Sequence, residues 1–220
     1  MIMAPAASAL DRRLVEFNQL PSRTLHPSRH AAFAPAAALD AMARAPALDA
    51  AWHRHWSRDI LRGLGLLDRP VTDAGRPELA LALLTPDALA LCARRLGAVL
   101  CGPRLRRAIA GDEVRLLIAS LGADLMDFAR RAAAGLHAGI AESTAWPIEQ
   151  AAAAVDALGH GALRAALSGG GPELRLRAEL KLPDLPAHDS PLTAADALSL
   201  GLSILKNTDP TWHSSFPAIR

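Results

Sequence analysis

The chain has 220 residues, 51% of them apolar and only 4% aromatic, so its core should be built from leucine and alanine, which suits packed helices better than a β-sandwich. A net charge of +2 is too small to indicate a polyanionic partner, and two cysteines do not make a secreted disulfide scaffold. There is no export signal and no run of about 18 uncharged apolar residues, so we expect a cytoplasmic protein without membrane insertion.

We expect an all-α protein, a single compact antiparallel multi-helix domain with an extended N-terminal strap and a looser C-terminal part. Residues 1–48 should form a short helix, over residues 8–20, and then a proline-rich strap. Three prolines within residues 21–35 exclude a continuous helix there. This segment should therefore lie extended over the body of the protein.

The central helical bundle is predicted over residues 49–168. Asp49 should cap its first helix, in which Trp52, Trp56 and Ile60 recur every four residues and form an apolar inner face. Further helices joined by tight turns should follow it. Short connections of this kind are typical of an antiparallel bundle.

The most regular helix of this bundle should begin after Thr85, which can cap it, with Pro86 at the first helical position. Gly102 and Pro103 should end that helix, and Asp112 should cap a later one. The residues expected to face inward on these two helices are Leu89, Cys92, Leu96, Val99, Val114, Leu117, Ile118 and Leu121.

The last third of the chain has weaker helical patterns. The helix that contains residues 159–161 should break there, because two glycines lie close together, and the glycines at 169–171 should form a flexible joint. Residues 172–220 are predicted to form a helical segment and a tail packed on the same domain. The long helix in this segment should begin after Thr193, which can cap it.

Residues 174–182 leave two interpretations open. Apolar and charged residues alternate there, and this period favours a strand. However, the chain has no second strand-like segment to pair with it, and an isolated strand is not stable. The same residues also suit a helix, in which Glu173 would face Arg177. We favour the helix.

No cofactor, metal or catalytic residue is predicted. Cys92 and Cys101 would point to opposite sides of a continuous helix, about 13–14 Å apart along its axis, which is too far for a disulfide. Both should be buried thiols. His26 and His30 are four residues apart, but Pro27 disrupts the helical face that a zinc-binding pair needs. The chain carries no nucleotide-binding, hydrolase or metalloprotease motif.

Residues 91–107 hold five arginines and no acidic residue, on both sides of the predicted turn. This set, the arginine corner, consists of Arg94, Arg95, Arg104, Arg106 and Arg107. It has three interpretations: the solvated end of a helical hairpin, a docking surface for a protein partner, or the site of a helical nucleic-acid-binding regulator. Arginine suits bidentate contact with protein carboxylates. The patch is short and lacks aromatic residues, which weakens the nucleic-acid interpretation.

Four stretches carry a family resemblance: FNQLPSRTLHPS (17–28), LGAVLCGPRLRRAIAGDEVRLLIASLG (96–122), LKLP (180–183) and DPTWHSSF (209–216). Together they resemble the SctK family, which includes YscK and PscK, cytoplasmic accessory proteins of bacterial type III secretion systems. The matching positions are Phe17, Asn18, Pro21, His26, Ser28, Gly97, Leu100, Gly102, Leu105, Arg106, Arg107 and Ile109. The chain departs from the family at Ser215, where a leucine is expected before Phe216.

The resemblance implies a non-enzymatic adaptor of the sorting platform, held at the cytoplasmic face of the inner membrane through the injectisome. Its partners would be the cytoplasmic domain of the membrane-ring protein SctD and the pod protein SctQ and, indirectly, the SctL–SctN stator and ATPase complex. The resemblance implies no nucleic-acid partner and transfers no catalytic residue. We expect the arginine corner, with Trp212 and Phe216 of the tail, to contact protein partners.

Overall fold

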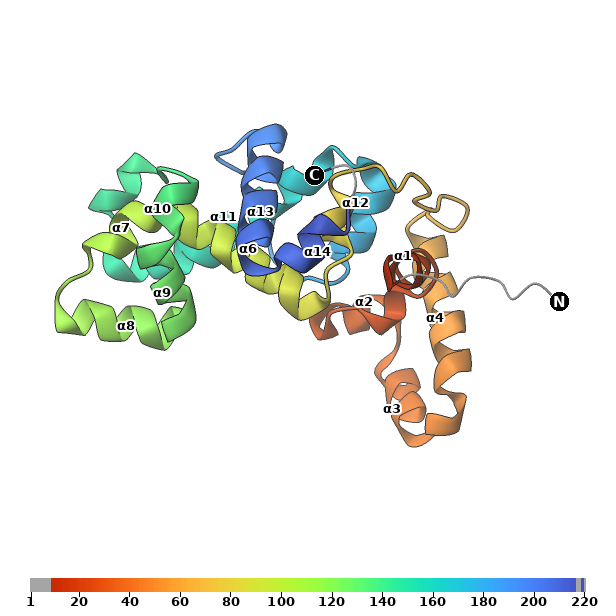
Figure 1. The fold of residues 1–220 in the computed structure, drawn as a ribbon. Coiled ribbons are helices and arrows are strands. Elements are labelled where there is room, and N and C mark those ends of the chain that lie inside the picture. The colour runs from red at the N-terminus through yellow and green to blue at the C-terminus, as the bar shows by residue number, and fades with distance from the viewer. Residues whose placement is uncertain (1–8, 217–218, 220) are drawn as a thin grey trace.

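The computed structural model describes residues 9–216 and residue 219. Every element formed by these residues is an α-helix or a 3-10 helix, so the all-α prediction is confirmed (Figure 1). Within the same residues, no helix is both long enough and apolar enough to cross a membrane. The first part of the predicted N-terminal segment, residues 1–8, lies outside the described residues.

Figure 1 shows a central body of helices with a lobe on each side. The N-terminal lobe contains α1 (Ala9–Gln19), η1 (Pro21–Arg23), η2 (Pro27–Arg29), α2 (His30–Phe33), α3 (Ala36–Arg44), η3 (Pro46–Leu48) and α4 (Asp49–Gly63). The central body contains α5 (Leu79–Ala82), α6 (Pro86–Leu100), α11 (Ile148–Ser168), α12 (Gly171–Glu179), α13 (Ala194–Thr208) and α14 (Pro210–Ser214). The far lobe contains α7 (Gly102–Arg107), α8 (Gly111–Leu121), α9 (Ala123–Arg131), α10 (Ala133–Leu136) and η4 (Ala141–Ala145).

Helices α6 and α11 cross at the centre of the molecule with their backbones in contact. A Cβ atom built on Gly97 would lie 1.8 Å from the Val155 carbonyl oxygen, and one built on Gly159 would lie 2.1 Å from the Ala93 carbonyl oxygen. Only glycine leaves room for so close a crossing. The predicted break near residues 159–161 is wrong, because α11 continues through them and its glycine serves helix packing.

The predicted caps of the two long helices α6 and α13 are confirmed. Thr85 accepts a hydrogen bond from the backbone N–H three residues later (3.4 Å), and Thr193 does the same at the start of α13 (3.2 Å). The predicted caps of α4 and α8 are wrong. Helix α4 begins at Asp49 itself, and α8 begins one residue before Asp112, so both carboxylates lie in a first turn, where negative charge suits the helix dipole.

Most of the residues predicted to face inward on α6 and α8 are buried, namely Leu89, Cys92, Leu96, Val99, Leu117 and Leu121. Val114 is half-buried. Ile118 is 42% exposed, so its predicted inward position is wrong. Helix α8 packs against α9 and α11 at the edge of the far lobe, and a helix in such a place buries only a narrow stripe.

The buried apolar residues of the described chain form three clusters, one centred on the central body, one on the far lobe together with parts of α6 and α11, and one on the N-terminal lobe. Phe128 and Leu158 pack against both the central cluster and the cluster of the far lobe, so these two are continuous. In the N-terminal lobe, Trp56 and Ile60 are buried and Trp52 is half-buried, which confirms the predicted inner face of α4.

The proline-rich segment lies against the body of the protein but is not extended. Pro21 and Pro27 each occupy the first turn of a 3-10 helix, a place where the missing N–H of proline is tolerated. Hydrogen bonds hold the segment on the body. The His26 N–H donates to the Leu180 carbonyl (2.9 Å), and Arg29 Nε donates to the Leu182 carbonyl (2.8 Å).

The alternating residues 174–182 form helix α12 and the turn after it. Arg177 and Lys181 are buried there, four residues apart, and both donate hydrogen bonds to backbone carbonyls. Arg177 binds the carbonyls of Leu66 (2.9 Å) and Arg69 (3.0 Å), and Lys181 Nζ binds two carbonyls at the end of α5 (2.7 and 2.9 Å). These two cations therefore tie α12 to residues 66–84.

Candidate docking surfaces

Two arginines of the arginine corner are held by groups of the protein itself. The Arg94 guanidinium donates to the Asp156 carboxylate and to the carbonyl at the end of α8, both at 3.1 Å. The Arg104 guanidinium donates to the Glu113 carboxylate (2.6 Å) and to a carbonyl of the turn before α11 (2.8 Å). Arg94 ties α6 to α11 and to the end of α8, and Arg104 ties α7 to α8 and to the turn before α11, so both side chains are fixed on the protein and only 33% and 12% exposed.

The other three arginines of the corner differ in exposure. The Arg95 guanidinium carbon lies 5.4 Å from the centre of the Phe128 ring, in a cation–π contact. Arg106 is half-buried, and its buried Nη1 has no hydrogen-bond partner among the described residues. Arg107 is exposed and makes no hydrogen bond or ion pair with them. Of the corner, Arg107 is therefore the arginine most available to a partner.

Ile109 follows Arg107 in the turn between α7 and α8 and is 87% exposed. A single exposed apolar residue is common on protein surfaces. Because Arg107 ends α7 and Ile109 lies two residues later in the turn, an exposed cationic and an exposed apolar residue lie close together in the chain at the tip of the far lobe. The sequence alone does not predict this exposure, because an isoleucine between two alanines fits a core as well as a surface.

The aromatic side chains of the tail belong to the central body. Trp212 Nε1 donates to the Ala80 carbonyl (2.9 Å), and the Trp212 ring contacts the Phe216 ring edge to face, with their centres 5.0 Å apart. The Arg13 guanidinium lies 4.4 Å from the centre of the Trp212 ring. Phe216 is only 1% exposed, so in this conformation it packs inside the chain and does not meet a partner.

The N-terminal lobe has two surface hollows. A groove of about 580 Å³ lies between α1, α4 and the loop after α4, and is lined by Val15, Arg54, Arg58 and Leu67 among others. A smaller hollow of about 170 Å³ lies between α3 and α4, and its lining is mostly apolar, including Phe33, Leu39, Met42, Trp52 and Trp56. Neither was predicted from the sequence.

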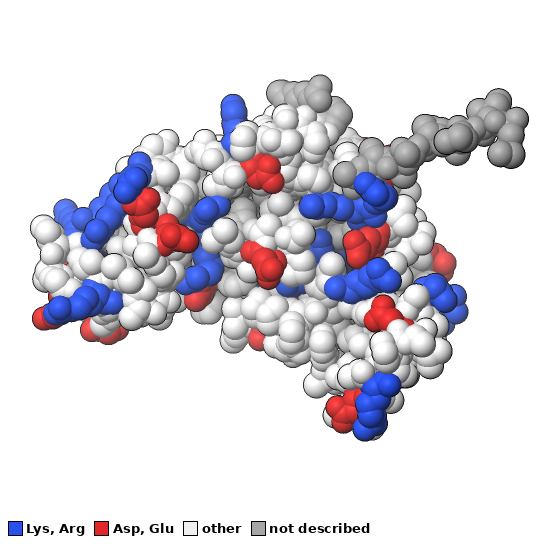
Figure 2. All heavy atoms as spheres, turned by 60° about the horizontal axis from the view of Figure 1, so that its bottom comes forward, with Lys and Arg blue, Asp and Glu red and all other residues white. Residues whose placement is uncertain are grey.

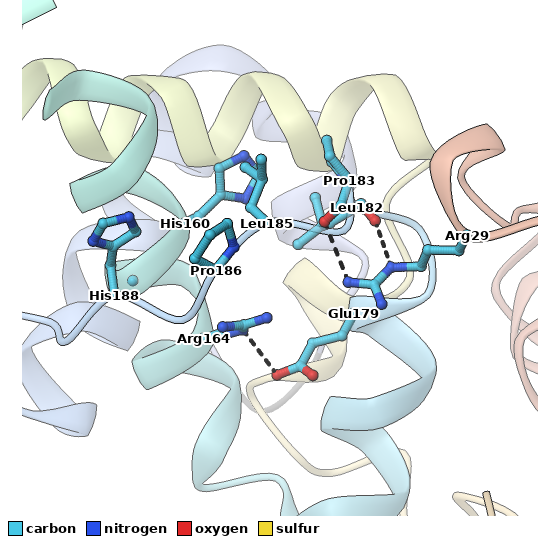
Figure 3. A pocket seen from close by; sticks show the side chains of 10 residues that line it. Arg29, His160, Arg164, Glu179, Leu182, Pro183, Leu185, Pro186 and His188 are labelled. Carbon is cyan, nitrogen blue, oxygen red and sulfur yellow. Dashed lines mark hydrogen bonds and ion pairs between the residues drawn. The ribbon is translucent and has the colours of Figure 1, made fainter. Parts of the chain in front are cut away.

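A small pocket with both polar and apolar lining residues lies between α11, α12 and the loop after α12 (Figure 3). Arg164 pairs with Glu179 at its floor (3.4 Å), and His160 and His188 lie on its other side. Burial lowers the pKa of His160. The space is about 10 Å³, the room of a single water molecule. A metabolite does not fit there in this conformation.

Cys92 and Cys101 are buried and form no disulfide, as predicted. Burial raises the pKa of both thiols to about 12, which makes them poor nucleophiles at neutral pH. The described residues contain no group of three or more His, Cys, Asp or Glu side chains placed to hold a metal ion.

Basic and acidic side chains are interspersed over the face of the molecule in Figure 2, where several arginines lie beside acidic residues. Among the ion pairs are Arg29–Asp184, Arg62–Asp59, Arg94–Asp156 and Arg131–Asp127. Such pairing limits the extent of any one basic surface.

Comparison with known proteins identified no relative. No family model matches the chain, no curated protein matches it, and no solved structure matches it.

Proposed function

We propose that the chain is a non-enzymatic adaptor of the type III secretion sorting platform. In this role it links the cytoplasmic domain of the SctD-type membrane-ring protein to the SctQ-type pod protein, and through the pod to the SctL–SctN complex. It works in the cytoplasm, at the injectisome. The resemblance to the SctK family, which runs in order from Phe17 to Phe216, is the basis for naming this system.

The observation that best supports an adaptor is the placement of exposed contacts at two ends of a helical body. The far lobe presents Ile109 beside Arg107 at its tip. The N-terminal lobe presents the groove between α1 and α4 on the other side of the central helices. Two separated surfaces let one chain bind two partners together, because neither partner covers the surface of the other.

Co-purification from bacteria tests the role. The tagged chain is expected to bring down both the ring protein and the pod protein. The substitutions Arg107→Glu and Ile109→Asp, made together, should remove one partner and leave the other, since both side chains are exposed and their loss leaves the core intact. The double variant R44E/L48D is the matched control, because it makes the same changes at two exposed positions of the N-terminal lobe.

Loss of one partner from the Arg107/Ile109 variant alone supports the proposal. Retention of both partners by that variant removes the far-lobe tip as a docking surface but leaves the adaptor role in place. Failure of the wild-type chain to bind either partner contradicts the role itself. The rival function, a nucleic-acid-binding regulator, requires DNA binding at low salt that falls steeply as salt rises, because each neutralised phosphate releases a counterion.

A further inference from the structure

The groove between α1 and α4 combines an apolar lining with unpaired positive charge. Val15 of α1 and Leu67 of the loop after α4 stand on it, 53% and 41% exposed, and both are among the most exposed large apolar residues of the described chain. Leu61 and Val71 lie at its base and are buried. At about 580 Å³, the groove lies within the size range of clefts that enclose ligands of several side chains.

The charge of the groove has one sign. Arg54, Arg58 and Arg177 line it, and no acidic residue is among its described lining. Arg177 donates hydrogen bonds to backbone carbonyls of residues 66 and 69. Arg54 and Arg58, in contrast, make no hydrogen bond or ion pair with any described residue. The acid beside Arg58 in the sequence, Asp59, pairs with Arg62 on the same helix (2.7 Å) and does not compensate them.

The spacing of Arg54 and Arg58 on α4 indicates how far apart the acidic groups of a partner should lie. Arg54 and Arg58 are four residues apart on α4, so they lie one above the other on the same face of the helix, separated by about 6 Å along the axis. A partner helix with two carboxylates one turn apart has the same spacing. Arginine binds carboxylates through two parallel hydrogen bonds, which gives such a match its specificity.

We infer that this groove binds an acidic amphipathic helix of a partner protein, with the apolar face of the helix against Val15 and Leu67 and its carboxylates on Arg54 and Arg58. The inference rests on the proposed adaptor role, and it specifies that the partner bound at the N-terminal lobe presents an acidic amphipathic helix. A protein helix fits better than a nucleic acid, because the described groove lining has exposed aliphatic side chains and no aromatic ring on which bases could stack.

A synthetic peptide tests this inference. The probe is an 18-residue helical peptide with leucines on one face and glutamates one turn apart along the edge of that face, labelled for fluorescence anisotropy. Its twin carries glutamine in place of every glutamate. The wild-type protein should bind the acidic peptide saturably and about tenfold more tightly than the glutamine peptide, and the difference should shrink as salt screens the charges.

The double variant R54E/R58E should bind the acidic peptide at least about tenfold more weakly, since two attractive charge pairs become repulsive. The variant R44E/K206E is the control. It reverses two exposed cations outside the groove, has the same net charge, and should bind within about twofold of wild type. The variant Leu67→Ser should weaken both peptides alike, by a few fold, because it removes only apolar contact.

Several results would overturn the inference: no saturable binding of the acidic peptide, equal affinity for the two peptides, or equal loss in R54E/R58E and in R44E/K206E. Binding of a 20-nucleotide single-stranded DNA that R54E/R58E abolishes, with no peptide binding, would assign the groove to nucleic acid instead. The adaptor role has a separate readout. A chain that binds the peptide but neither ring nor pod protein refutes only that role, and a chain that binds both proteins but no peptide refutes only the groove.

Discussion

Replacing Gly97 by alanine should destabilise the protein, although alanine is the better helix former. Within a helix the exchange normally gains about 1 kcal/mol. Here the new Cβ atom would lie 1.8 Å from the Val155 carbonyl oxygen, whereas an ordinary contact is 3.4 Å or more, so α6 and α11 must separate by more than an ångström at their crossing.

The obstacle at Gly97 is a backbone carbonyl and not the end of a flexible side chain, so the strain is not relieved by a rotamer change. Overpacking of a core costs about 1–3 kcal/mol and occasionally more, and this site belongs at the upper end. After the helix-propensity gain is subtracted, we expect the free energy of unfolding to fall by about 2 kcal/mol.

Urea denaturation followed by circular dichroism measures this loss as a lower midpoint with an unchanged slope. Gly63→Ala is the control, because a Cβ atom at Gly63, the last residue of α4, meets nothing within 4 Å. This variant should be neutral or more stable by up to about 1 kcal/mol. A Gly97→Ala protein as stable as wild type would show that the two helices do not cross in the way described.

Three further predictions concern buried side chains. Burial lowers the pKa of Lys181 to about 7, whereas in the unfolded chain this lysine keeps its ordinary pKa. From pH 7.5 to 9.5 the unfolded chain therefore binds one more proton than the folded chain, so the free energy of unfolding of wild type should rise relative to that of Lys181→Met by about 1 kcal/mol per pH unit. A constant difference between the two proteins in urea titrations would contradict this. Cys92 and Cys101 should resist Ellman's reagent in the native protein and react in urea, and rapid native labelling would show that they are accessible. Phe216→Ala should cost about 3–5 kcal/mol in thermal or urea unfolding, whereas a loss below about 1 kcal/mol would mean that the tail is not packed as described.

Two of the helix caps, which depend on local chemistry alone, were predicted correctly from the sequence. The caps at Thr85 and Thr193 each depend on a side chain and a backbone group three residues apart, so the sequence contains the whole interaction. The predicted break near Gly159 failed because a glycine that admits a neighbouring backbone cannot be told from a helix-breaking glycine without knowing the neighbour.

The helix favoured for residues 174–182 is confirmed as α12, and buried charged residues explain why the strand interpretation stayed open. Residues 174–182 alternate apolar and charged because Arg177 and Lys181 face inward with their apolar neighbours, where loop carbonyls accept their hydrogen bonds. An interpretation based on hydrophobic periodicity assigns such charged residues to the solvent-exposed face. In the arginine corner, Arg104 is engaged by Glu113, nine residues later, a pairing that only the folded turn creates.

The groove of the N-terminal lobe could not be predicted from the sequence for a different reason. Its lining comes from three segments, around residues 14–20, 54–61 and 67–72, and from Arg177 of α12, which the fold brings together. The arginine stripe of α4 is visible in the sequence, but the apolar residues opposite it are not adjacent to it in the chain. Surfaces assembled from distant segments require the tertiary structure.

An adaptor has to hold two partners at the same time, and size-exclusion chromatography with light scattering measures this directly. The purified chain is mixed with the cytoplasmic domain of the ring protein and with the pod protein, singly and together. The account predicts one complex that contains all three proteins and does not form when this chain is left out. Two complexes that exclude each other, or no complex at all, would contradict it.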